Sequence, residues 1–269
     1  MNYKEMIRVR RGLVVLAILV ALALLVDFSF RDQQGSSTVQ VQIGDQAPPA
    51  ASHVHVAPEQ ELRARFGIPL SLLFAIAGIV ATFFAAMYGS SLASENNGHL
   101  DVAWTMPASR NRYALTLIAV DILGAVTAFA MALGTALIEL AIARMLGNVY
   151  VDQDAWLNLA RFLLLPIAFT GFWQALTASR KAQSGGIVGL SVVACLVFLG
   201  LGAAHLPTAF HALVSFINYF NPMVYGTYST GMVNHGSPFQ TPLLDVVALG
   251  LIGIVGTALA LMQWRRLEA

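Results

Sequence analysis

Six apolar runs, each long enough to cross a membrane as a helix, constrain this chain more than any other feature. A bilayer core about 30 Å thick needs about 20 mostly apolar residues per helical crossing. Hydropathy places such runs at residues 13–30, 68–90, within 113–146, 155–178, 186–204 and 243–264. Because a backbone in lipid must satisfy its own hydrogen bonds, we predict an all-α membrane protein with six transmembrane helices in one domain, residues 1–269.

The composition excludes two classes of protein. Hydrophobic residues make up 57% of the chain and charged residues only 11%, against roughly a quarter charged in soluble domains, so neither a soluble nor a disordered chain is expected. No segment between the runs exceeds about 40 residues, which is too short for a separate catalytic domain. The net charge of +1 gives no sign of a nucleic-acid partner. The single cysteine, Cys195, excludes an intramolecular disulfide and a cysteine metal cluster.

Lysine and arginine set the predicted orientation, because cytoplasmic loops carry the excess of both. With both termini in the cytoplasm, the cytoplasmic segments carry Lys4, Arg8, Arg10, Arg11, Arg110, Arg112, Arg180, Lys181, Arg265 and Arg266. The outer side keeps Arg31, Arg63, Arg65, Arg144 and Arg161. The first run could instead be a signal peptide, but no small-residue cleavage site follows Asp27. The stretch 113–146 is read as one long helix that tilts, kinks or projects, since splitting it spoils the charge bias.

Three segments outside the runs have predicted structures. Residues 1–11 form either an interfacial helix on the cytoplasmic surface or a basic flank that only orients the first span. The outer loop 31–66 contains a period-two pattern typical of a small hairpin, followed by a short helix from Pro58. The outer segment 205–241 is apolar but broken by prolines, and its run 210–220 is too short to cross, so a re-entrant or interfacial helix is expected.

Enzymatic signatures are missing from the sequence. The two lysines, Lys4 and Lys181, follow Tyr3 and Arg180, so no phosphate-binding P-loop exists. No His-Glu zincin motif and no Gly-x-Ser-x-Gly elbow occurs either. We therefore predict no catalytic residue, no cofactor and no metal site on this chain. A metal pair formed by His53 and His55 is disfavoured against solvated loop histidines, because nothing else completes the site.

The loop 91–112 between the second and third runs carries the most information. Gly98 permits a sharp turn, Leu100 and Trp104 fall on one face of a short helix, and Pro107 ends that helix. Ser109 can then cap the third span. Two interpretations remain open: an apolar knob that docks into a groove of a partner, or an ordinary connector whose tryptophan dips into the membrane.

The order of residues in this loop resembles the ABC-2 type permease family. Glu95, Gly98 and Leu100, followed by Met106-Pro107-Ala108-Ser109-Arg110 ahead of a long helix, are similar to the family's pattern, although His99 stands where relatives carry threonine. The basic start of the chain, the turn 179–182, and Asn221-Pro222 with Tyr225 in the outer segment also resemble the family in the same order.

The resemblance implies the permease subunit of an ATP-driven transporter in the bacterial inner membrane. A second permease subunit, identical or different, would complete the pathway among membrane lipids, and separate ATPase subunits would bind ATP and Mg²⁺. The loop would be the coupling helix on the ATPase, and the outer segment would line the outer gate. Export is favoured and the substrate is left open. The ATPase-coupling residues would be Glu95, Gly98, Leu100, Trp104, Pro107 and Arg110.

Two acids in the long third run have two interpretations. Asp121 and Glu139 are five turns apart on one helical face, about 27 Å along the axis. They could form a polar stripe along a pathway or subunit interface, or they could be boundary residues. The alternative function is a gradient-driven secondary transporter or channel that uses these two acids. A third function, an anchor subunit that binds haem or metal, needs facing histidines inside spans, and none is expected there.

The last run contains a glycine repeat and an acid. Gly250, Gly253 and Gly256 recur every three residues, which favours close helix packing within the subunit rather than a substrate role. Asp245 opens the run, where the helix dipole favours an acid and no function is required.

Overall fold

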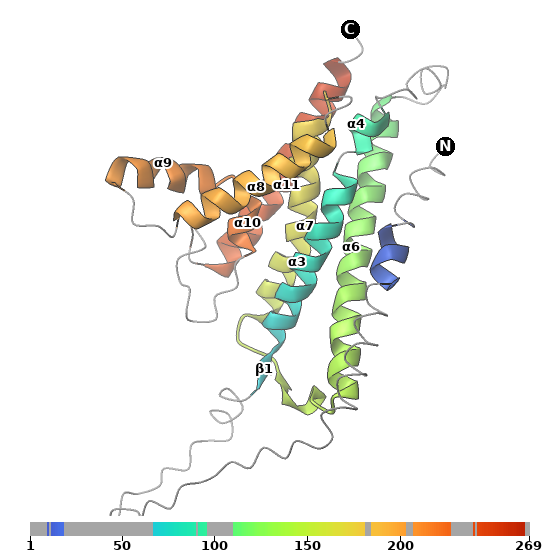
Figure 1. Ribbon diagram of the computed structural model, residues 1–269, viewed down its shortest axis with the longest axis vertical. Helices are drawn as coiled ribbons and strands as arrows, with labels where there is room; N and C mark the ends of the chain where they lie inside the picture. Colours follow the sequence, from blue (N-terminus) through green and yellow to red (C-terminus); the bar gives the residue numbers. More distant parts are fainter. Residues whose placement is uncertain are drawn as a thin grey trace, which may run out of the picture.

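The computed structural model describes residues 10, 12–18, 67–89, 91–95, 110–180, 184–202, 207–226, 239 and 241–266. The described part is mostly helical (Figure 1). Its elements are β1 (Ile68–Pro69), α3 (Leu70–Tyr88), α4 (Ser91–Glu95), α6 (Arg110–Ile142), η1 (Leu146–Asn148), β2 (Val149–Tyr150), α7 (Ala155–Thr177), α8 (Ser184–Gly202), α9 (Thr208–Asn218), α10 (Pro222–Tyr225) and α11 (Pro242–Arg266).

Five helices are long and apolar enough to cross a membrane. They are Leu70–Ala93, Asn111–Ile142, Ala155–Thr177, Ser184–Gly202 and Pro242–Arg266, and they correspond to the last five predicted runs. The first predicted run, 13–30, is described only through residue 18, where it is helical. The chain is therefore a multi-pass membrane protein, and the sixth span stays a prediction.

The long third run is a single helix. α6 has 33 residues, about 50 Å at the α-helical rise, and Figure 1 shows it along the full height of the bundle. The prediction of one long helix is confirmed. Because the helix is longer than a bilayer core is thick, it must tilt or project from the membrane.

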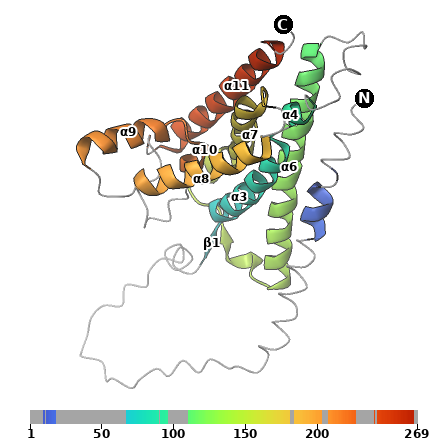
Figure 2. The same cartoon turned by 45° about the horizontal axis from the view of Figure 1, so that its top comes forward.

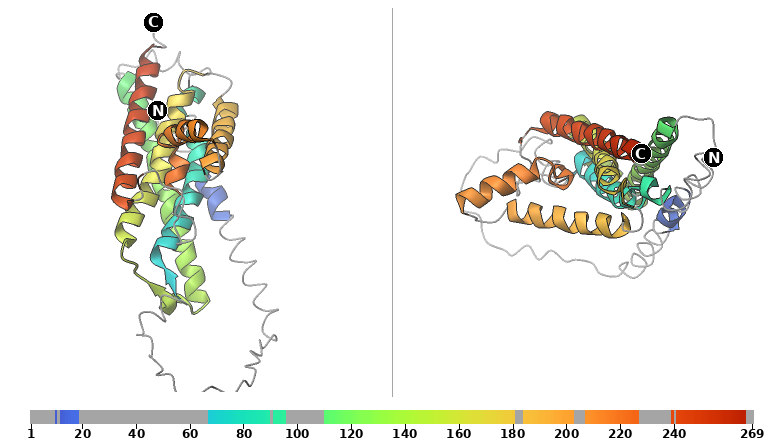
Figure 3. Two further views of the ribbon diagram at one scale, coloured as in Figure 1. Left: turned by 90° about the vertical axis from the view of Figure 1, so that its left-hand side faces the viewer. Right: turned by 90° about the horizontal axis from the view of Figure 1, so that it is seen from above.

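Helix α7 is the centre of the bundle and contacts α3, α6, α8, α10 and α11. Seen from above in Figure 3, α8 and α11 lie on opposite sides of it. Its aromatic residues Phe162, Phe169 and Trp173 are buried in the main core. Pro166 inside α7 has no N–H for the carbonyl of Phe162. Gly78 of α3 packs there, where a Cβ would lie 2.8 Å from the Phe162 oxygen.

The predicted glycine packing joins α7 to α11. A Cβ on Gly171 would lie 2.5 Å from the Gly253 oxygen, and one on Gly256 would lie 2.6 Å from the Gly171 oxygen. The two backbones touch directly, so the prediction of close packing within the subunit is confirmed for Gly253 and Gly256. Around Gly250, by contrast, a Cβ would meet nothing within 4 Å. We call Gly171, Gly253 and Gly256 the glycine seam.

A short parallel pairing of β1 with β2 was not predicted from the sequence. It brings the loop after α6 to the start of α3, where Asp152 accepts a hydrogen bond from the backbone N of Ser71 at 3.1 Å and another from its hydroxyl. Asn158 of α7 donates to the same hydroxyl at 2.9 Å. Asp152 therefore caps α3 from a distant part of the chain.

The predicted short apolar segment 210–220 corresponds to α9, which has 11 residues. Figure 2 shows α9 beyond α8, projecting to the side away from α6. The predictions for residues 1–9, the loop 31–66 with its histidines, and most of the loop 91–112 lie outside the described residues.

Candidate functional site

The predicted coupling loop is bracketed by two described helices. α4 ends at Glu95 and α6 begins at Arg110, directly after the predicted cap at Ser109. Gly98, Leu100, Trp104 and Pro107 lie outside the described residues, so their assigned roles stay predictions. The structure does describe the two residues that flank the loop, at the end of α4 and at the start of α6. We call the end of the bundle where they lie the α4 end.

A buried polar cluster holds α4 to the bundle. The Ser91 hydroxyl donates to Asp121 Oδ2 at 2.5 Å, and Gln174 Nε2 donates to the same oxygen at 2.8 Å. Gln174 Nε2 also lies 2.5 Å from the Ser91 oxygen. All three residues are 0% exposed. This Asp121 cluster (Ser91, Asp121 and Gln174) joins α4, α6 and α7 through side chains alone.

A second set of contacts fixes the end of α3 beside this cluster. The last carbonyls of a helix have no partner within it, and here α7 supplies donors. The Thr177 hydroxyl donates to the Gly89 oxygen at 3.0 Å, and Gln174 Nε2 lies 3.4 Å from the Tyr88 oxygen. A Cβ on Gly89 would lie 2.6 Å from that of Trp173, so the turn out of α3 sits directly on α7. The start of the loop is thus attached to α7 at several points.

Exposed arginines gather at the α4 end. Arg112 lies in the first turns of α6, Arg180 follows α7, and Arg265 and Arg266 end α11. Arg265 Nε donates to Asn111 Oδ1 at 3.1 Å, which ties the ends of α11 and α6 together. Arg144 lies at the opposite end of α6.

The two candidate pathway acids have different surroundings. Asp121 is completely buried within the subunit, and Glu139 is half-buried five turns further along α6. The expectation that an ionisable residue at membrane depth faces the bundle interior therefore holds for Asp121. Its hydrogen-bond donors, Ser91 and Gln174, were not predicted, although a glutamine inside an apolar run is a signal, because such a side chain tends to hydrogen-bond to a neighbouring helix.

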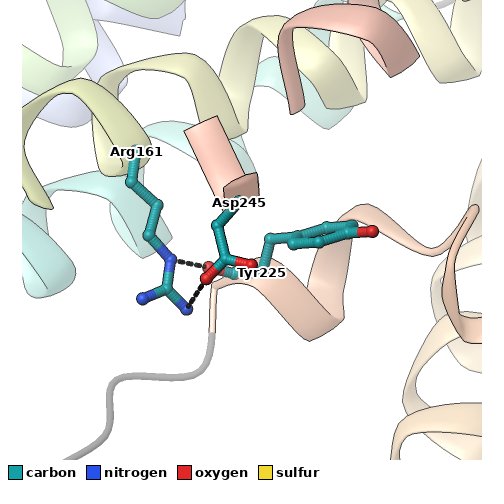
Figure 4. A network of polar contacts seen from close by, with 3 residues as sticks. All are labelled: Arg161, Tyr225 and Asp245. Atoms are coloured by element: carbon teal, nitrogen blue, oxygen red, sulfur yellow. Dashed lines mark hydrogen bonds and ion pairs between the residues drawn. The ribbon is translucent and has the colours of Figure 1, made fainter. Parts of the chain in front are cut away.

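A second buried cluster contains an ion pair that the sequence did not predict. Arg161, which the charge count assigned to the outer side, lies within α7, and Asp245, for which no function was required, faces it from α11 (Figure 4). Arg161 Nη2 lies 3.5 Å from Asp245 Oδ2, with side chains 7% and 2% exposed. Arg161 Nε donates to the Tyr225 oxygen at 2.5 Å. A buried arginine requires an acid partner. An arginine inside an apolar run is therefore a signal for such a pair, and the count of charges on the two sides of the membrane did not use it. We call Arg161, Tyr225 and Asp245 the Arg161 cluster.

Aromatic rings surround the Arg161 cluster. The guanidinium carbon lies 5.4 Å from the ring centroid of Phe162, within range of a cation–π contact. The rings of Tyr225 and Phe239 stack with centroids 6.4 Å apart. The Tyr225 hydroxyl donates to the Tyr219 oxygen at 2.9 Å. Burial, together with the negative charge of Asp245, raises the pKa of Tyr225 to about 12, so its phenol stays a donor at neutral pH.

Asparagines attach the segment α9–α10 to α8. Asn218 Nδ2 donates to the Phe198 oxygen at 3.0 Å, and Asn221 Nδ2 donates to the Cys195 oxygen at 2.9 Å. Asn221 also caps α10 by accepting from the Met223 N at 3.0 Å, with Pro222 as the first helical residue. The motif Asn221-Pro222 therefore starts α10, three residues after α9 ends at Asn218.

Among the described residues, no group of three or more His, Cys, Asp or Glu is placed to hold a metal ion. His211 lies exposed on α9, with its Nδ1 3.4 Å from the Ser215 hydroxyl. Comparison with family models, curated proteins and solved structures finds no match to this chain. The functional assignment consequently rests on the sequence pattern and on the geometry of these two clusters.

Proposed function

We propose that the chain is the permease subunit of an ABC-2 type ATP-driven transporter in the bacterial inner membrane. It forms the membrane pathway as a dimer with a second permease subunit and couples to separate ATPase subunits. The observation that carries this proposal is the Asp121 cluster. It fixes α4, from which the loop with the family-like residues departs, to both α6 and α7.

The Asp121 cluster would allow a coupling loop to transmit force to the membrane helices. Closure of an ATPase dimer on ATP would push the loop, whose two ends are α4 and the first residue of α6. Because α4 is hydrogen-bonded to α6 and α7, the push is transmitted to these two helices and does not move α4 alone. α6 is a single helix of 33 residues, so a displacement at the loop reaches the far end of the bundle.

The charge distribution supports placing the α4 end in the cytoplasm. Arg112, Arg180, Arg265 and Arg266 are exposed there, as the excess of positive charge on the cytoplasmic side requires. The opposite end then faces outward, with α9 and α10 as the outer segment between the last two spans. In this orientation the proposed direction is export.

The buried carboxylate of Asp121 favours one second candidate, a gradient-driven transporter. An acid at membrane depth that accepts hydrogen bonds from neutral donors, Ser91 and Gln174, is a candidate proton carrier. In that mechanism Asp121 takes up and releases a proton during each cycle, and no ATPase subunit is needed. The two candidates therefore differ in whether a partner protein is required.

Co-purification tests the proposal first. The chain, tagged and expressed in its native cell, should bring down a soluble protein with a P-loop in stoichiometric amount. A chain that purifies alone, is stable in detergent and transports without ATP contradicts the proposal and favours the gradient-driven mechanism.

The coupling loop is tested with two tryptophans of the same chain. We expect Trp104→Ala, like a change at Glu95, to uncouple ATP hydrolysis from transport while insertion stays intact, because the apolar contact with the ATPase is reduced. Trp156 is 73% exposed at the opposite end, so Trp156→Ala is the matched control and should keep coupling. Full transport and full ATPase binding by Trp104→Ala would refute the assigned role of this loop.

A further inference from the structure

The segment made of α9 and α10 is attached on two sides by different chemistry. On one side, amides of Asn218 and Asn221 donate to backbone oxygens of α8 at 3.0 and 2.9 Å. On the other side, the guanidinium of Arg161 donates to the backbone oxygen of Tyr225, the last residue of α10. The second contact is charge-assisted, and its donor has a second partner in Asp245.

The two helices that carry Arg161 and Asp245, α7 and α11, form a rigid unit. Arg161 belongs to α7 and Asp245 to α11, and these two helices touch backbone to backbone along the glycine seam. The ion pair between them is nearly excluded from solvent. Opening the pair would leave an uncompensated buried charge, which is strongly unfavourable. Arg161 and Asp245 therefore belong to one unit.

The helix that accepts the hydrogen bond from Arg161 is, in contrast, small. α10 has four residues, begins at Pro222, and does not continue α9. Its attachment to Arg161 is a backbone oxygen, which can exchange the guanidinium for water without leaving a charge unpaired, because Asp245 stays beside Arg161. The contact that can be released is thus the one with Tyr225.

We propose that Arg161 is the positioning residue that latches α10 onto the α7–α11 unit, and that α10 leaves Arg161 when the outer end of the pathway opens. This proposal rests on the proposed transport function. In the state described here, the latch is closed, with Arg161 Nε 2.5 Å from the Tyr225 oxygen. Asp245 keeps the guanidinium oriented during opening.

Cysteine accessibility tests the latch in the full-length chain. In a Cys195→Ala background, which removes the single native thiol, Val224→Cys reports on α10 and Ala81→Cys reports on α3, since both positions are buried. A membrane-impermeant maleimide is applied from the outer side. We expect Arg161→Gln to increase the labelling rate at position 224 roughly tenfold or more and to leave position 81 unchanged.

Two results would overturn the latch. One is a labelling rate at position 224 that Arg161→Gln leaves unchanged. The other is faster labelling at both positions, which means that Arg161 only holds the bundle together. Arg144→Gln is the matched control, because Arg144 is an exposed arginine outside the cluster. It should change neither rate.

A cross-link tests the same idea without disturbing Arg161. A Cβ on Gly226 would lie 2.9 Å from the Leu165 side chain, so Leu165→Cys with Gly226→Cys can tie α10 to α7. We expect the oxidised pair to lose transport and the reduced pair to regain it. Full transport by the oxidised pair contradicts the proposal. Labelling needs no ATPase, so a failed co-purification and a failed latch are distinguished.

Discussion

The Asp121 cluster and the Arg161 cluster share one helix but are built differently. Gln174 and Arg161 both belong to α7, thirteen residues or about 20 Å apart. In the Asp121 cluster a carboxylate accepts hydrogen bonds from the neutral side chains of Ser91 and Gln174, and these bonds connect three helices. The Arg161 cluster has both charges, and its third partner is a backbone oxygen at the end of a helix of four residues.

This difference makes the Asp121 cluster a fixed joint and the contact between Arg161 and α10 a releasable one. Breaking the Asp121 cluster leaves buried side-chain groups without partners, which costs their full desolvation. Releasing α10 from Arg161 leaves the ion pair intact, although it also exposes the buried residues Pro222, Val224 and Tyr225. The proposed transport function would need both a joint that transmits motion at the α4 end and a contact that opens at the other end.

The largest effect should come from removing the acid of the Arg161 cluster. Asp245→Ala leaves Arg161 buried without its ion-pair partner, so we expect a loss of about 3–5 kcal/mol in the free energy of unfolding, measured by denaturant titration in detergent. The double variant Arg161→Met with Asp245→Leu should lose much less, because no charge stays buried. Equal losses for the single and double variants would show that the pair does not act as one charged unit.

The next largest effect tests whether α7 and α11 move as one body. Gly256→Ala places a methyl group 2.6 Å from the Gly171 oxygen, so the two backbones must separate, and we expect a loss of about 1–3 kcal/mol in unfolding free energy. Gly250→Ala on the same helix meets nothing within 4 Å and should be close to neutral. If both variants behave alike in thermal unfolding, the glycine seam does not hold the unit that the latch requires.

A smaller effect is expected at the fixed joint. Asp121→Asn keeps the size of the side chain but replaces two charge-assisted hydrogen bonds with neutral ones, so we expect about 1–2 kcal/mol less stability. ATP-driven transport should persist, because the joint is still hydrogen-bonded. Loss of transport in Asp121→Asn, with a folded protein and an intact ATPase complex, would instead support Asp121 as a proton carrier.

The sequence predicts the helices well and the clusters poorly, for a physical reason. A membrane helix is a local property, since about 20 apolar residues in a row suffice, and the spacing of Gly253 and Gly256 marks one packed face. Which side chains meet depends on how each helix is rotated against its neighbours. Asp121 and Gln174 are 53 residues apart in the chain, and nothing local indicates their contact. Arg161 was counted with the outer loops, although an arginine seven residues into α7 has to find an acid.

The smallest effect is expected where a polar contact lies outside the two clusters. Asp152 caps α3 through Ser71 but is only partly buried, so water can replace part of what it provides. We expect Asp152→Asn to lower the unfolding free energy by about 0.5–1 kcal/mol, measured in the same titration. Asp154 is the matched control, because it precedes α7 without a side-chain capping bond, and Asp154→Asn should be neutral. If Asp152→Asn instead destabilises the protein as much as Asp245→Ala, burial does not set the strength of these contacts, and the distinction between a fixed joint and a releasable contact loses its physical basis.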